Sequence, residues 1–166
     1  SLGNEEIRLR ASTQLLNDAM LFSRLSGLNA KESMDLLVGA LKQVGIAAQA
    51  ASGQQENIAT TFGRADEVMG TWLVAVQGGV VSLQDLAETF SITGAEALAA
   101  GLSIAELTAV ATTLAESTGK SSAEVGNSVR RMLTTIQSET GIEALRKVGI
   151  AVEDINVNRM VHNHCL

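Results

Sequence analysis

The sequence predicts an all-α fold, a bundle of antiparallel helices and helical hairpins without a β-sheet. The 166 residues include no proline, so no position is closed to helix on that ground. Apolar residues recur at the 3.6-residue spacing of amphipathic helices. A serine followed three residues later by an acidic residue, the pattern of a helix N-terminal capping box, also recurs. Together these patterns predict six to eight helices.

The composition predicts how these helices pack. Hydrophobic residues make up 46% of the chain, which is enough to form a core, but aromatic residues only 2%. The core must therefore come from Ala, Leu, Val, Ile and Met. Small side chains at this frequency favour close contacts between helices.

Residues 1–26 are expected to form one N-terminal helix with Asn4 as its cap. Gly27 ends it. The helix has two apolar faces, the first consisting of Ile7, Ala11, Leu15, Phe22 and Leu25, and the second of Leu9, Leu16 and Met20. An apolar face on two sides predicts burial on two sides, by other helices or by a second chain.

Residues 27–154 are expected to form the helical core. Asn29 with Glu32 three residues on starts a helix that we expect to end at Gly45, a typical C-terminal glycine. The Ala- and Gln-rich segment 47–63 is a possible hinge. A further helix is expected over 65–76, before the Gly78-Gly79 pair. Residues 155–166 are expected to be a disordered or non-native tail.

Three capping boxes mark the helix starts of the second half: Ser82 with Asp85, Ser103 with Glu106, and Ser121 with Glu124. Between the last two boxes, a short turn around Gly119 predicts an antiparallel helical hairpin. In that hairpin, one row of apolar residues would face another: Leu107, Val110 and Leu114 against Val125, Val129 and Met132.

The turn Gly119-Lys120-Ser121 has the ending of a phosphate-binding loop. That motif needs a glycine where this chain has Leu114, and a strand before the turn where this chain has a helix. A helix turn with a capping serine is the better interpretation. No nucleotide or other cofactor is therefore expected.

Candidate metal ligands and catalytic groups are few. His162, His164 and Cys165 lie together, but a zinc site needs four ligands and only carboxylates such as Glu153 or Asp154 could complete this one. The paired carboxylates, Glu5-Glu6, Asp66-Glu67 and Glu153-Asp154, are adjacent in sequence and are explained as solvated helix ends. We expect no catalytic residue, no metal site and no enzyme.

Charge and hydropathy limit the partners. The formal net charge is −6 and the basic residues are scattered, so no nucleic-acid-binding face is visible. The apolar run 97–115 approaches the length of a membrane span, but Gly101 and the Ser103–Glu106 box divide it into two shorter helices.

The order of these motifs resembles the tail tape measure proteins of tailed bacteriophages. The resemblance covers the helical core from Gly27 to Asp154 and is closest in three blocks: the helix start Ser82–Glu88, the helix pair Gly101–Ile136 and the ending Leu145–Val152. Residues 47–64 and those after Asp154 do not share it.

The resemblance implies a structural protein that sets the length of the tail tube. It implies tube subunits and tail assembly chaperones as partners, and location in the tail lumen, or in the host cytoplasm during assembly. Self-association through helix faces is also expected, and membrane contact only on ejection. Two alternatives remain open: a membrane-active helical module that forms pores or translocates, and a generic helical interaction domain.

Overall fold

The computed structural model describes residues 2–52 and 58–147, and these residues form eight helices and no strand. The all-α prediction is confirmed. The helices are α1 (Leu2–Ser26), α2 (Ala30–Ser52), α3 (Ile58–Gly63), α4 (Ala65–Val76), α5 (Leu83–Ala99), α6 (Ile104–Thr118), α7 (Ser122–Gln137) and α8 (Glu139–Lys147). The predicted tail 155–166, the end of the predicted core and part of the possible hinge lie outside the described residues.

Local side-chain hydrogen bonds start most of these helices where the sequence predicted. All three serine capping boxes form; in the α6 box, the Glu106 amide donates to Ser103 Oγ at 3.1 Å and the Ser103 amide donates to Glu106 Oε2 at 2.7 Å. Asn29 and Glu32 make the equivalent pair before α2. At the end of α6, Gly119 has φ +61°, a left-handed conformation that suits glycine.

Two predicted helix ends are wrong. Helix α1 begins at Leu2, so Asn4 lies within it and is not its cap. Helix α2 continues through Gly45 to Ser52. A Cβ atom at Gly45 would lie 2.7 Å from Thr61 Oγ1, so this glycine allows α3 to approach α2 closely. At Gly45 the absence of a side chain allows close packing between two helices, and the helix does not end there.

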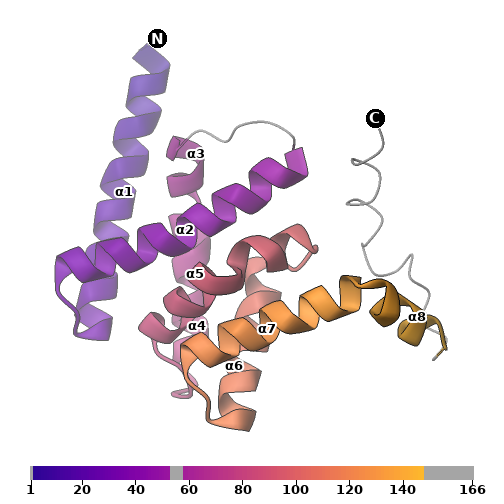
Figure 1. Cartoon of the computed structure of the whole chain (residues 1–166). Helices are drawn as coiled ribbons and strands as arrows, with labels where there is room; N and C mark the ends of the chain where they lie inside the picture. Colours follow the sequence, from indigo (N-terminus) through magenta and orange to yellow (C-terminus); the bar gives the residue numbers. More distant parts are fainter. Residues whose placement is uncertain (1, 53–57, 148–166) are drawn as a thin grey trace.

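Helix α5 lies at the centre of the molecule, between α2 and α7 (Figure 1). Glycines take part in its contacts with both helices. A Cβ added at Gly94 would lie 3.1 Å from Gln43 Cβ of α2, and one added at Gly126 of α7 would lie 3.1 Å from Ile92 Cβ. The expected packing through small side chains is therefore seen on both sides of α5.

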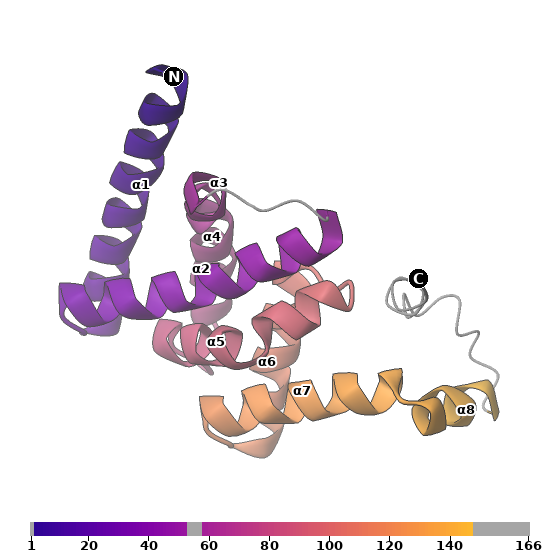
Figure 2. The ribbon, with the colours of Figure 1, turned by 45° about the horizontal axis from the view of Figure 1, so that its top comes forward.

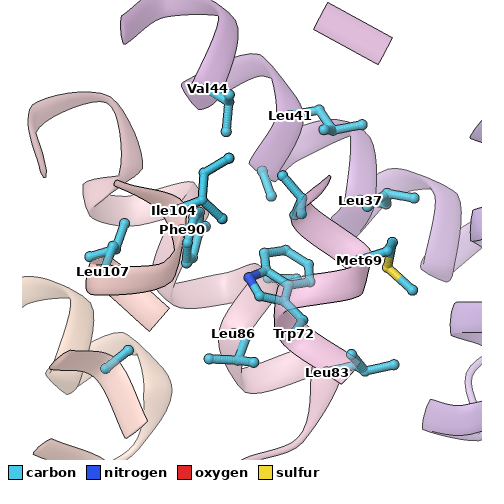
Figure 3. Close-up of a cluster of buried hydrophobic side chains, with 14 of the residues drawn as sticks. Leu37, Leu41, Val44, Met69, Trp72, Leu83, Leu86, Phe90, Ile104 and Leu107 are labelled. Carbon is cyan, nitrogen blue, oxygen red and sulfur yellow. The ribbon is translucent and has the colours of Figure 1, made fainter. Parts of the chain in front are cut away.

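The core gathers where α2, α4, α5 and α6 meet (Figure 3). Trp72 and Phe90 lie at its centre with no exposed surface, and their rings meet edge to face with centroids 5.1 Å apart. Aliphatic side chains surround the two rings; Leu37, Leu41, Met69, Leu86 and Leu107 are among those that are fully or almost fully buried.

The predicted hairpin around Gly119 forms only in part. Helices α6 and α7 contact each other, and Leu107, Val125 and Val129 are buried as expected. However, α7 packs chiefly on α5, and Met132 is 42% exposed. The pairing predicted along the whole length of both helices is therefore wrong at Met132, because α5 offers α7 the closer surface.

Candidate interaction surface

The outer face of α1 carries a row of exposed apolar side chains. Leu9 is 69% exposed, Leu16 52% and Met20 45%. Spacings of seven and four residues place the three side chains on one side of the helix. These residues are the second apolar face that the sequence predicted, and the fold leaves them uncovered.

The opposite face of α1 holds the helix on the body of the protein. Ala11, Leu15, Ala19 and Phe22 are buried, and Phe22 has no exposed surface. At the end of the helix, Ser23 Oγ donates to the carbonyl of Leu28 at 2.7 Å, and Gly27 has φ +73°. Helix α1 lies at one side of the molecule in both views, with its N-terminal end extending beyond the other helices (Figures 1 and 2). The outer face is thus presented on a fixed element.

A pair of carboxylates lies where α1 meets α4. Asp18 is only 9% exposed, and burial together with the negative charge of Asp66 raises its pKa to about 6. Oδ2 of Asp18 has no hydrogen-bond partner among the described residues, whereas Asp66 accepts a hydrogen bond from the Gln14 amide. These three side chains line an open groove together with Leu9, Arg10, Thr13 and Asn17. The groove adjoins the outer face of α1.

Sequence reasoning missed this pair, because Asp18 and Asp66 are far apart in the chain. The available signal was the position of Asp18, three residues after Leu15 and four before Phe22, on the edge of the first apolar face. A carboxylate at the edge of an apolar face is expected to be partly removed from water.

A second apolar area lies at the far end of the molecule. Met132 and Ile136, near the end of α7, are 42% and 37% exposed. Ile142 and Leu145 of α8 are half-buried, and α8 has no buried residue. This area includes α8, which ends at Lys147, the last described residue.

The turn Gly119-Lys120-Ser121 borders a small pocket of about 190 Å³ between α5, α6 and α7. Ser121 Oγ is committed to the capping box, where it accepts from the Glu124 amide and contacts the Glu124 carboxylate at 2.9 Å. The Ser121 hydroxyl and the Ser121 amide both donate to the Glu124 carboxylate, and these two hydrogen bonds hold the pKa of Glu124 below its usual range. Asp85 also lines the pocket and would repel a phosphate. The turn is a helix junction here, as the sequence predicted.

The other candidate groups are placed as follows. His162, His164, Cys165, Glu153 and Asp154 lie outside the described residues. Within residues 2–52 and 58–147, no three potential metal ligands gather in one place. Glu5 lies in the first turn of α1 and Glu6 follows it, whereas Asp66 and Glu67 lie in the first turn of α4; all four are exposed. The described helices also include none with the length and apolar character of a membrane span.

Comparison with known proteins identifies the family. The model of a family described as phage-related minor tail protein matches residues 2–163, almost the whole chain. Searches of curated proteins and of solved structures found no match. The match covers every described helix, including α1 with its exposed outer face. The chain therefore belongs to the family of phage-related minor tail proteins.

Proposed function

We propose that the chain is a segment of a tail tape measure protein, a structural and non-enzymatic scaffold whose length determines the length of the tail tube. The observation that carries the proposal is the family match over residues 2–163, which includes the three blocks that resemble tape measure proteins in order, from Ser82 to Val152. The chain would act in the tail lumen after assembly in the host cytoplasm, with tube subunits and assembly chaperones as partners.

The physical basis of a helical ruler is the fixed rise of the helix. One residue adds 1.5 Å, so the 166 residues would span roughly 250 Å as a single helix. In the fold described above the helices lie across one another, and α1, the longest, has only 25 residues. As a ruler, the segment would have to open from this compact form into an extended one. Helix α8 would separate from the core at little cost, because none of its residues is buried.

Graded deletions within the parent protein test the proposal. Removing residues 104–137 should shorten the tail by roughly 50 Å, and removing residues 83–137 by roughly 80 Å. These boundaries coincide with helix ends, so the first deletion removes α6 and α7 as whole helices and the second removes α5, α6 and α7. Tail lengths are measured by electron microscopy of assembled particles.

A replacement variant serves as the control. An unrelated helical sequence of the same length in place of residues 83–137 should restore the tail length, because a ruler depends on residue number and not on sequence. Assembled tails of unchanged length in both deletions would remove this segment from the ruler. Tails that form only with the native segment would show a specific binding role instead.

A further inference from the structure

We propose that the outer face of α1 binds the same face of α1 in a second copy of this chain, with the two helices antiparallel. The face is a seam of four side chains along the outer side of the helix: Leu9, Thr13, Leu16 and Met20. The three apolar members are 45–69% exposed, and Thr13 is exposed as well. The steps from Leu9 to Met20 are four, three and four residues, the alternation found in the contact seam of coiled coils.

The register follows from matching the seam with itself. In an antiparallel pair, Leu9 lies opposite Met20 of the second copy, and Thr13 lies opposite Leu16 of the second copy. This register is symmetric, so each of these contacts occurs twice. The body of the protein packs against the opposite face, through Ala11, Leu15 and Phe22, and leaves the seam exposed.

Charge selects the antiparallel orientation. Glu6 and Arg24 are 18 residues apart, about five helical turns, so both lie on the same flank of the seam. In the register above, each Glu6 lies beside Arg24 of the second copy, in addition to its own contact with Arg10 at 2.6 Å. A parallel pair would instead gather Glu5 and Glu6 of both copies at one end. The helix dipoles also favour opposite directions.

The oligomeric state of the full chain tests the pairing. Analytical ultracentrifugation should show a dimer for the wild type, a monomer for Leu16→Glu and a dimer for Val74→Glu, the matched control. Val74 is 70% exposed on α4, so both variants place a charge at an exposed apolar position. Circular dichroism checks that both variants fold. A monomeric wild type, or a Leu16→Glu variant that still forms dimers, overturns the proposal.

Cysteine cross-linking tests the orientation, in a Cys165→Ser background. Leu9 and Met20 are roughly 16 Å apart along one helix, which is farther than a disulfide can span. A disulfide between positions 9 and 20 of two chains therefore indicates the antiparallel pair, and a disulfide between two positions 9 indicates a parallel pair. A mixture of Leu9→Cys and Met20→Cys chains should form mixed disulfides. Rapid disulfide formation by Leu9→Cys with itself would show a parallel pair and overturn the antiparallel assignment. The outcome is independent of tail length, because the pairing does not rest on the ruler proposal.

Discussion

At the scale of single residues, Asp18 has the most unusual environment. It is an acid on the edge of the buried face of α1, and Asp66 adds a second negative charge nearby. Burial favours the neutral carboxyl, so the pKa of Asp18 is about 6 in the folded chain. The folded state therefore binds this proton more tightly than the unfolded chain does. The stabilising contribution of the Asp18 proton is greatest below a pH of about 3.8, the pKa of Asp18 in the unfolded chain. It is lost as the pH rises through 6, the pKa of Asp18 in the folded chain.

Replacing Asp18 by Asn should stabilise the protein at neutral pH. The amide is close in size to the carboxyl and is neutral at every pH, so the free energy of unfolding at pH 7 should rise by about 1–3 kcal/mol. The gain should shrink as the pH falls below 6 and be small at pH 4, where Asp18 is protonated in the folded chain and partly protonated in the unfolded chain. Urea unfolding of both proteins from pH 4 to 8 measures the difference. A difference that does not change with pH would show that the Asp18 charge is not the cause.

Two leucines of α6 differ in how much their side chains contribute to the stability of the fold. Leu107 has no exposed surface, whereas Leu114 is only half-buried against the same core. We expect Leu107→Ala to cost about 2–5 kcal/mol and Leu114→Ala clearly less, because the exposed part of Leu114 leaves no cavity. Val74→Ala, at an exposed position, should change stability by less than about 0.5 kcal/mol. Equal costs for Leu107 and Leu114, measured by urea unfolding, would contradict the burial described here.

At the scale of helices, glycines decide which surfaces meet. Gly94 and Gly126 bring α2 and α7 onto opposite sides of α5, and Gly45 brings α3 onto α2. Each lies inside a helix, where glycine costs up to about 1 kcal/mol relative to alanine. The cost is offset because helices without an intervening side chain approach more closely and gain dispersion contacts.

Gly126→Leu tests the contact between α5 and α7. The new side chain would overlap Ile92, since even a Cβ would lie 3.1 Å from Ile92 Cβ, and overpacking of this kind costs about 1–3 kcal/mol. The control is Gly70→Leu in α4, where a Cβ would meet nothing within 4 Å. That substitution should be neutral or stabilising, because leucine is the better helix former. Adding Ile92→Ala to Gly126→Leu should recover part of the loss. Equal effects at Gly70 and Gly126 in thermal unfolding would rule out the close contact.

At the scale of the whole molecule, compactness separates the isolated chain from the proposed ruler. A folded chain of 166 residues has an expected radius of gyration of about 15 Å. A single helix of the same length would have a radius of gyration of roughly 70 Å. Small-angle scattering from the Leu16→Glu variant, in which the proposed dimer is absent, should give a radius of gyration of about 15 Å. A radius of gyration of roughly 70 Å would mean that the chain is already extended in isolation.

The sequence alone determined the helices and most of their ends. Capping boxes are local: Ser103 and Glu106 need only each other, so three residues of separation suffice to predict the start of α6. The bounds predicted for α4, residues 65–76, are those observed. The exposed outer face of α1 was also predicted as an apolar face, because its spacing is a property of one helix.

Only the tertiary structure decided which of these surfaces meet. Gly45 looks like a helix end in sequence and proves to be a contact point, because its role depends on Thr61 of another helix. Likewise α7 packs chiefly on α5 and not on its neighbour in sequence, and Asp18 lies near Asp66 of α4. These choices depend on the summed packing of side chains distant in sequence, which no local pattern records. Helix formation is governed by hydrogen bonds within a few residues, and assembly by contacts that exist only after the chain has folded.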